Sequence, residues 1–417
     1  MRKKTRFFFK ITILAFIIGV LFAGARAFAA EDSRNELYKN IELFSEAITS
    51  IQSDYVKDVD SKDLIYGALG GMLSSLDGYS QFLTPEDFKE MQIDTKGEFG
   101  GLGIEIGMRD GVLTVISPID GTPADAAGLK SGDRVVKIEG ELTRGISLSE
   151  AVKKLRGEAN TSVTLSVWRE SEGKIIDFNI TRGVIKIKSI KVARIIEDTI
   201  AYIKLVEFQE STPKELEKEL VTLEKNGMRG LVLDLRNNPG GLLDVAYEVS
   251  DKFLSEGVVV VSLKGRHPKQ NKVYTARSKR SFTDFPMAVL VNEGSASASE
   301  IVAGAIKDNR RGIIVGTKTF GKGSVQTVTP LKDGSAIRIT TSDYYTPANH
   351  SISEVGIIPD VTVEKEKVLE AVDVSKEEEL FEKIEPDGKK KEKEVYDNQL
   401  DVAIGIVKGT LLGNDKN

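Results

Sequence analysis

The sequence contains no cysteine and only two histidines, His267 and His350, among its 417 residues. The absence of cysteine excludes disulfide bonds and metal sites built from thiolates. Two histidines also argue against a zinc site built from imidazoles. No metal and no other cofactor is therefore expected.

An excess of one charge sign is absent as well, since 58 basic residues are balanced by 63 acidic ones and the formal net charge is -5. Such a balance argues against a dedicated nucleic-acid surface, so no nucleic-acid partner is expected. Hydrophobic residues make up 40% of the chain. That content allows a substantial core, and the length fits two or three domains.

The N-terminus is predicted to be an export signal. Residues 1–6 are basic, an apolar run follows over 11–25, and 27–29 read Ala-Phe-Ala, a small-x-small cleavage site. The run is short for a membrane-spanning helix, although Phe7–Phe9 could lengthen it. Membrane anchoring through an uncleaved segment is the open alternative. In both cases the protein is expected outside the cytoplasm, either secreted, periplasmic or anchored to the outer face of a bacterial cytoplasmic membrane.

The pattern along the chain predicts an α+β multidomain protein. A signal or anchor over 1–30 precedes a helical region over 31–92. Short strands, glycines and two helices follow over 93–184, and an α/β layered pattern over 185–363. A charged linker and a C-terminal helix fill 364–417. The apolar stripes of the terminal helices predict docking within the chain or a homodimer built through these helices.

Several elements can be predicted by their bounds. Ser162–Arg169 is expected to be the last strand of the glycine-rich region, after a helix over Leu148–Leu155. The basic and polar stretch Arg266–Arg280 is expected to be an exposed loop. Ser335–Tyr344 alternates as a strand should, and Gln399–Leu412 regains a helical apolar stripe.

Chemistry is expected between Val291 and Gln326. An apolar strand leads there into small residues and then into a helical pattern. A serine at such a turn lies at the positive end of a helix dipole, where oxyanions are stabilised. Ser295, Ser297 and Ser299 all fit, and composition does not choose among them. Lys322, in the glycine-rich turn that follows, could serve as the base.

Two other chemistries can be weighed on the same residues. Gly316–Gly323 nearly matches a phosphate-binding loop, but Gly323 stands where a magnesium-binding hydroxyl belongs. An exported protein would also lack ATP. A Ser-His-Asp triad would need His267 or His350, and His350 is expected in a loop near Pro347.

The region from Gly97 to Arg182 resembles a PDZ domain of the kind attached to bacterial exported proteases. The resemblance is carried by the glycine turn Gly100–Ile106 and by the signature over Gly121–Val135. PDZ domains bind peptide C-termini as an added strand. The resemblance implies that Gly101, Leu102, Gly103 and Ile104 hold the carboxylate end of a protein substrate.

A second resemblance covers roughly residues 35–363. The motifs at 71–77, 234–241, 294–305, 318–326 and 356–360 are similar to those of the carboxy-terminal processing proteases, the tail-specific serine peptidases. The resemblance implies that Ser297 is the nucleophile, Lys322 its base, and Gln326 the residue that orients the lysine. The amide of Ala298 and that of Gly240 or Gly241 would form the oxyanion hole.

These motifs predict an exported serine endopeptidase that recognises protein C-termini through its PDZ domain and cleaves through an acyl-enzyme. Arg156, at the end of the second PDZ helix, is a candidate regulatory residue. The alternative is that Arg156 is only a solvated arginine, favoured at this position by the helix dipole. The non-enzymatic alternative is a catalytically inactive PDZ-containing envelope adaptor protein. The intact set of Ser297, Lys322 and Gln326 argues against that alternative.

Overall fold

The computed structural model describes residues 35–197, 199–277, 282–353, 355–365 and 396–414. The predicted export signal and nearly all of the charged stretch after residue 364 lie outside these residues. The chain divides into two compact units, Met1–Thr84 and Pro85–Asn417. Over the described ranges, no helix is both long enough and apolar enough to cross a membrane.

The first unit is mainly helical, as predicted. A helix covers residues 35–54, and α2 covers Ser61–Ser74 with Asp60 as its N-cap, whose side chain accepts a hydrogen bond from the Lys62 amide. A short strand, β1, follows at Gln81–Leu83. The apolar stripe of the first helix, including Leu37 and Ile41, is exposed in the single chain. Its docking partner therefore stays a prediction.

The second unit begins with α3, Pro85–Lys96, which has proline at its first position, where the missing amide hydrogen costs no helical hydrogen bond. An antiparallel sheet in the order β3-β4-β5-β7-β8 follows, and α5 packs Ala151 and Leu155 into its core. The elements of this PDZ region are β2 Glu98–Gly101, β3 Ile104–Arg109, β4 Val112–Pro118, α4 Pro123–Ala126, β5 Arg134–Ile138, β6 Glu141–Leu142, α5 Leu148–Leu155, β7 Ser162–Arg169, β8 Lys174–Thr181 and β9 Gly183–Lys186.

The expectation that Ser162–Arg169 is the last strand of this region is wrong. The chain turns through Glu170–Glu172 and a left-handed Gly173, with φ of 60°, and returns as β8 along the full length of β7. Every second side chain of β8 from Ile176 to Ile180 faces the sheet's core. This alternation of apolar and polar residues is typical of a half-buried strand, so the sequence contained a signal for β8 that the interpretation did not use.

The largest sheet follows the order β10-β11-β12-β15-β16-β19. Only the first pair is antiparallel, and the other strands run parallel. This is the α/β layered core expected from the alternating pattern. Its strands are β10 Ile190–Ile196, β11 Ile200–Leu205, β12 Gly230–Asp234, β15 Met287–Val291, β16 Ile313–Gly316 and β19 Val361–Thr362.

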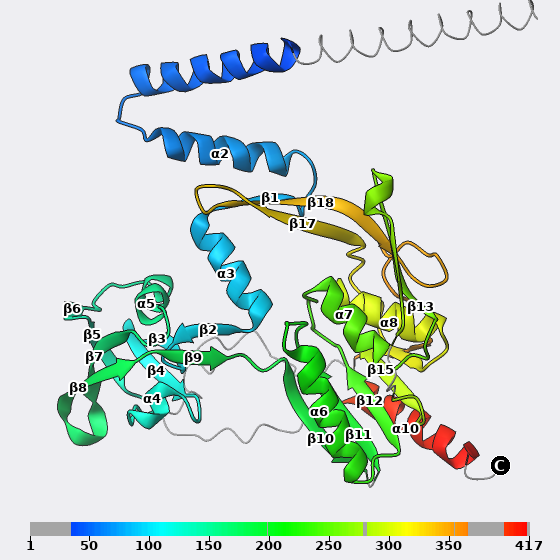
Figure 1. Ribbon diagram of the computed structural model, residues 1–417. Helices are drawn as coiled ribbons and strands as arrows, with labels where there is room; N and C mark the ends of the chain where they lie inside the picture. Colours follow the sequence, from blue (N-terminus) through cyan, green and yellow to red (C-terminus); the bar gives the residue numbers. More distant parts are fainter. Residues whose placement is uncertain (1–34, 198, 278–281, 354, 366–395, 415–417) are drawn as a thin grey trace, which may run out of the picture. The chain divides into compact units, whose positions relative to one another are not determined.

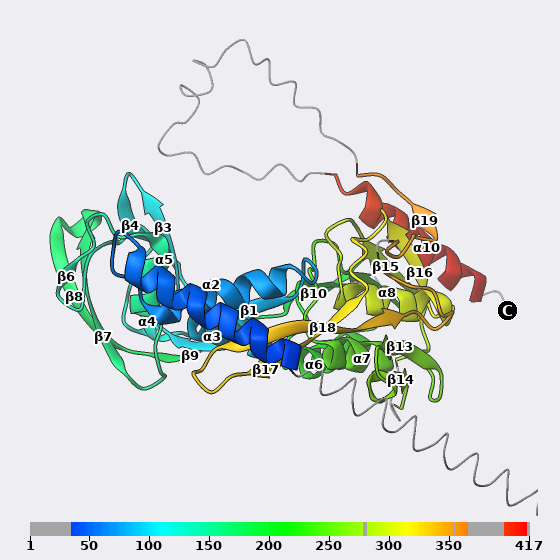
Figure 2. The same ribbon diagram turned by 90° about the horizontal axis from the view of Figure 1, so that it is seen from above.

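Helices cover both faces of this sheet (Figure 1). Leu231 and Leu233 of β12 pack against α6 (Thr212–Lys225), α7 (Leu243–Asp251) and α8 (Ala298–Asp308). Val232, between them, faces α10, which covers Asn398–Asn414. Burial on both faces explains the apolar run of β12 from Leu231 to Leu233. The view from above shows α10 beside β16 and β19 (Figure 2).

A smaller antiparallel sheet contains β13 (Val259–Gly265), β14 (Lys272–Thr275), β17 (Ser324–Pro330) and β18 (Ala336–Tyr345). The β18 strand was predicted, whereas β17 was not. The expectation of a loop throughout Arg266–Arg280 is wrong, because β14 pairs with β13. Residues 278–280 lie outside the described part. The missed strands are half polar, and each is paired with the strand next to it in the sequence.

Candidate active site

The candidate residues meet where three neighbouring parallel strands end. Loop 235–241 follows β12, Ser297 follows β15, and Lys322 lies in the loop after β16. Because the carboxyl ends of parallel strands share one edge of a sheet, these three loops converge. A cleft of about 450 Å³ at this edge is lined by Ser297, Lys322, Gln326 and Gly241. The structure therefore brings together candidates that are up to 85 residues apart.

Ser297 is the N-cap of α8, and its backbone is strained. Its φ of 55° and ψ of -112° are unusual for a residue with a side chain. Such conformations cost about 1–3 kcal/mol and are found most often at functional sites. The strained turn gives Ser297 a partly exposed position in the cleft at the start of a helix.

The two neighbouring serines have different surroundings. Ser295 and Ser299 are fully buried. The Ser295 hydroxyl donates to the Leu235 carbonyl at 2.8 Å, and the Ser299 hydroxyl donates to the Asn238 carbonyl at 2.9 Å. Both hydroxyls thus attach α8 and its preceding turn to the loop after β12. Ser297 alone of the three lines the cleft.

Lys322 is partly buried on the other side of the cleft. Burial lowers the pKa of its ammonium group below the ordinary value, and the nearby positive charge of Arg338 lowers it further. The carboxylate of Glu300 acts in the opposite direction. The backbone of Lys322 is held at both ends of the residue, because its amide donates to Glu300 and its carbonyl accepts from the Tyr344 hydroxyl. A lysine so placed is a better base than a solvated one.

Gln326 lies on β17 and lines the same cleft. Its side-chain amide donates to the Ser324 hydroxyl at 2.9 Å and to the Thr340 hydroxyl at 3.3 Å. The amide is therefore held by the sheet of β17 and β18. A role in orienting Lys322 stays a prediction.

The backbone amides near Ser297 include two that are available to an oxyanion. Among the described residues, the amides of Ala298 and Gly241 have no hydrogen-bond acceptor, whereas the Gly240 amide donates to the Asn238 side chain at 2.9 Å. A methyl group on Gly240 would come within 2.9 Å of Cβ of Ser297 and within 3.0 Å of the Ala298 nitrogen. Gly240 therefore lets loop 235–241 approach the serine, and Gly241 is the better donor of the two.

Glu300 is a site residue that the sequence interpretation missed. This fully buried carboxylate accepts hydrogen bonds from the amide of Ser297 at 2.8 Å, the hydroxyl of Thr319 at 2.6 Å, and the amides of Gly321 and Lys322 at 2.7 and 2.9 Å. It links the two loops that carry Ser297 and Lys322. The signal was present in the sequence, because a serine followed three residues later by glutamate marks a helix start.

The same contacts bear on the alternative of a phosphate-binding loop. The amides of Gly321 and Lys322, which would have to face a phosphate, donate to the Glu300 carboxylate. A carboxylate in this position would repel a phosphate. The alternative of a histidine triad has no support either, because the described lining of the cleft includes neither His267 nor His350.

The PDZ region has a small cavity at the position of the predicted peptide groove. Gly101, Leu102, Gly103 and Ile104 line a small cavity of about 100 Å³, and Val152, Leu155 and Arg156 of the α5 side form its other wall. The Arg156 guanidinium lies over the Phe99 ring at 4.5 Å. One wall of the cavity is thus a glycine-containing loop, and the other includes a guanidinium that lies over an aromatic ring. Over the described part of the chain, no group of three or more His, Asp or Glu side chains could hold a metal ion.

Comparison with family models assigns three segments of the chain. Residues 199–363 match peptidase family S41, and residues 114–169 match a PDZ domain. Residues 23–86 match the N-terminal domain of the activating protease CtpB. Together with the layered core and the serine at the start of α8, these matches define a serine-type peptidase that carries a PDZ domain.

Individual relatives narrow the class further. A carboxy-terminal-processing protease of Bartonella bacilliformis is 42% identical over 363 residues, which are 85% of this chain and 82% of the relative. A probable CtpA-like serine protease of Staphylococcus aureus (strain COL) is 39% identical over 79% of this chain and 66% of its own length. A solved photosystem II D1 C-terminal processing protease is 30% identical over 77% of this chain and 86% of that chain, with a TM-score of 0.46. The chain belongs to the carboxy-terminal processing protease family.

Proposed function

We propose that this protein is an exported serine endopeptidase that captures protein C-termini in its PDZ groove and cleaves peptide bonds with a Ser297–Lys322 dyad. The observation that carries the proposal is the cleft that Ser297 and Lys322 line together, where burial lowers the pKa of the lysine. The predicted export signal over 1–30 supports a site of action outside the cytoplasm, with the N-terminus as cleaved signal or as membrane anchor.

The proposed reaction has two halves that use the same groups. Neutral Lys322 takes the proton of the Ser297 hydroxyl as its oxygen attacks the scissile carbonyl carbon. The amides of Ala298 and Gly241 donate to the oxyanion of the tetrahedral intermediate. The C–N bond breaks as Lys322 returns the proton to the leaving amine. Water, deprotonated by Lys322, then attacks the acyl-enzyme, and the released Ser297 takes the proton back.

The substrate is proposed to be a protein with a free C-terminus. In this proposal, Gly101–Ile104 bind the carboxylate with loop amides, and the peptide adds as a strand in the groove beside α5. Gln326 keeps Lys322 directed at Ser297 in the productive complex. Arg156 couples occupation of the groove to the core.

Substitution of the three serines tests the dyad. Ser297→Ala should abolish hydrolysis of casein and of a C-terminally extended peptide, with the circular dichroism spectrum unchanged. Ser299→Ala is the matched control: it removes a buried hydroxyl that donates to Asn238, so it should lower thermal stability but keep turnover. Activity that survives Ser297→Ala would contradict the proposal. A wild-type protein that binds free C-termini without cleaving any of these substrates would also contradict it, and would favour the adaptor instead.

A further inference from the structure

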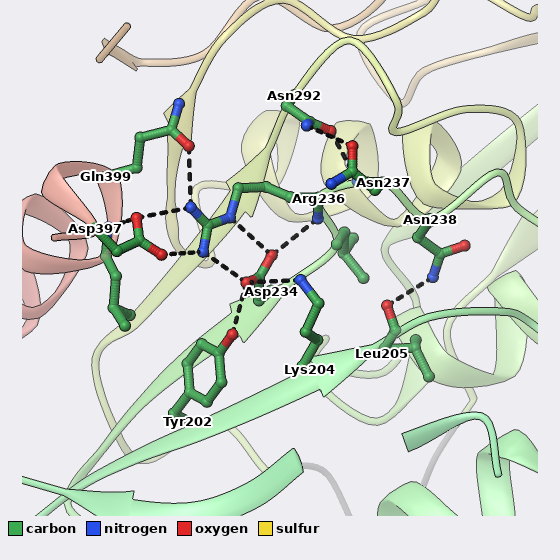
Figure 3. A network of polar contacts seen from close by, with 12 residues as sticks. Tyr202, Lys204, Leu205, Asp234, Arg236, Asn237, Asn238, Asn292, Asp397 and Gln399 are labelled. Atoms are coloured by element: carbon green, nitrogen blue, oxygen red, sulfur yellow. Dashed lines mark hydrogen bonds and ion pairs between the residues drawn. The ribbon is translucent and has the colours of Figure 1, made fainter. Parts of the chain in front are cut away.

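A buried ion network connects the C-terminal helix to the loop after β12 (Figure 3). Its centre is Asp234, a fully buried carboxylate at the end of β12. Asp234 accepts hydrogen bonds from the Tyr202 hydroxyl at 2.7 Å and from the Lys204 ammonium at 3.2 Å. It also accepts three hydrogen bonds from Arg236, one from the backbone amide and two from the guanidinium.

All five N–H groups of the Arg236 guanidinium have an acceptor, and three of these acceptors come from the C-terminal segment. Nη1 donates to Asp397 at 2.8 Å and to Gln399 at 3.0 Å, and Nη2 donates to the second Asp397 oxygen at 2.7 Å. The remaining two donors reach Asp234. A guanidinium held bidentately on two sides has a fixed plane and position. Burial alone would raise the pKa of Asp397, but the hydrogen bonds and charge of Arg236 hold it below its usual range.

Arg236 lies at the start of the loop that approaches the nucleophile. The next residue, Asn237, has a left-handed φ of 57°, and it exchanges hydrogen bonds with Asn292 at 2.8 Å in both directions. Asn238 then donates to the Leu205 carbonyl and accepts from the Gly240 amide. Four residues separate Arg236 from Gly241, whose amide is the proposed oxyanion donor. A shift of the arginine would therefore move this amide.

We infer that Asp397 is a positioning residue for the proposed oxyanion hole, acting through Arg236, so that the C-terminal helix takes part in catalysis. The inference rests on the proposed function. Asp397 lies outside the segment that matches the peptidase family model, which ends at residue 363. It is also the N-cap of α10, because it accepts from the Leu400 amide at 3.1 Å. A merely structural role would hold α10 on the sheet without affecting the loop.

A second ion pair on the same helix provides a matched control. Lys408 pairs with Glu197, which follows β10, and both side chains are about half exposed. This pair also joins α10 to the sheet, but neither residue contacts the loop after β12. Lys408→Gln and Asp397→Asn therefore each remove one ionic attachment of α10. Only the second replaces an acceptor of Arg236, because an NH₂ group takes the place of one Asp397 oxygen.

The experiment measures steady-state kinetics and amide hydrogen exchange on the full chain. Asp397→Asn should lower kcat at least about tenfold while KM stays within about twofold, because a displaced oxyanion donor affects the transition state more than the ground state. Amides of residues 237–242 should exchange faster in this variant. Lys408→Gln should change neither kcat nor this exchange. Unchanged kcat and exchange in Asp397→Asn, or equal changes in both variants, would overturn the inference.

Two additions keep the test decisive. Gln399→Met removes a single acceptor of Arg236 and leaves Asp397 in place as the N-cap of α10. It should lower kcat, as Asp397→Asn does, and it can be measured even if Asp397→Asn fails to fold. An unchanged kcat in a folded Gln399→Met protein would then overturn the inference. Hydrogen exchange does not depend on turnover. A wild-type protein without peptidase activity would therefore contradict the proposed function, while the exchange contrast would still show whether Asp397 positions the loop.

Discussion

The protonation of a single side chain, Lys322, sets the pH range in which the proposed base can work. Its folded pKa lies below 10.5, the ordinary lysine value, because burial and Arg338 disfavour the charged form. Activity should therefore rise with pH as the ammonium loses its proton, with the midpoint below that ordinary value. A measured kcat/KM profile from pH 5 to 10 checks the direction.

Replacement of Arg338 tests the cause of this shift. Arg338→Gln removes a positive charge near Lys322, so the midpoint of the pH profile should move to higher pH. Lys332→Gln, at an exposed position in the turn between β17 and β18, is the control and should leave the midpoint unchanged. A midpoint that stays in place or moves toward acid in Arg338→Gln would exclude Lys322 as the titrating base.

Glu300 should be as sensitive as the proposed dyad itself. Glu300→Gln would replace an acceptor of four hydrogen bonds with a group whose NH₂ faces N–H donors. The free energy of unfolding should fall by about 2–4 kcal/mol, and turnover should be largely lost. Denaturant unfolding and peptide hydrolysis measure the two effects. The exposed Glu293→Gln, whose partner is the Thr317 hydroxyl, should change stability by less than about 0.5 kcal/mol.

At the scale of elements, the approach of loop 235–241 to α8 depends on Gly240. Gly240→Ala would place a methyl group within 3.0 Å of Ser297 and Ala298, at a φ of 108°. Activity should fall by at least about a hundredfold, because the loop and its oxyanion donor must move away. Gly257→Ala has a similarly positive φ, 88°, with open space around the new methyl group. It should lose stability but keep kcat/KM, and equal losses in both variants would refute the steric argument.

The elements differ in how well the sequence predicts them. The α/β layered core was predicted from the local pattern, because strands such as β12 are apolar up to the aspartate at their end and the helices have an apolar face. In contrast, β8, β14 and β17 were missed. Of these, β8 alternates as a half-buried strand does and could have been predicted from that pattern. β14 and β17 have no regular alternation, and a local pattern does not reveal their pairing with β13 and β18.

The same distinction holds for the site. Ser297 could not be separated from Ser295 and Ser299 on local grounds, because the acceptors that bury the other two hydroxyls lie about 60 residues earlier, at Leu235 and Asn238. Glu300 could have been predicted from its spacing after Ser297. Asp397 could not, since 161 residues separate it from Arg236.

At the scale of the whole molecule, α3 lies between the cleft of Ser297 and a cavity that borders the proposed peptide groove. Met91 and Thr95 of this helix line the cleft beside Ser297. On its other side, α3 shares a cavity of about 480 Å³ with Phe99 and Arg156, which also line the peptide groove. A peptide that displaces Arg156 from Phe99 would therefore act on an element that borders the cleft. Such a peptide shifts activity only if it binds the active arrangement more tightly than the resting one.

Peptide stimulation tests this connection. A peptide with a free apolar C-terminus should raise the cleavage rate of a second, internally labelled substrate severalfold, and its amidated twin should not, because only a free carboxylate can use the amides of Gly101–Ile104. Arg156→Ala should still bind the peptide but lose the stimulation. Lys154→Ala removes the same charge from an exposed position on α5 that lines neither the groove nor the cavity beside α3, and it should respond as wild type does. Full stimulation in Arg156→Ala, or equal stimulation by both peptides, would leave the PDZ domain as a tether that concentrates substrate without controlling the cleft.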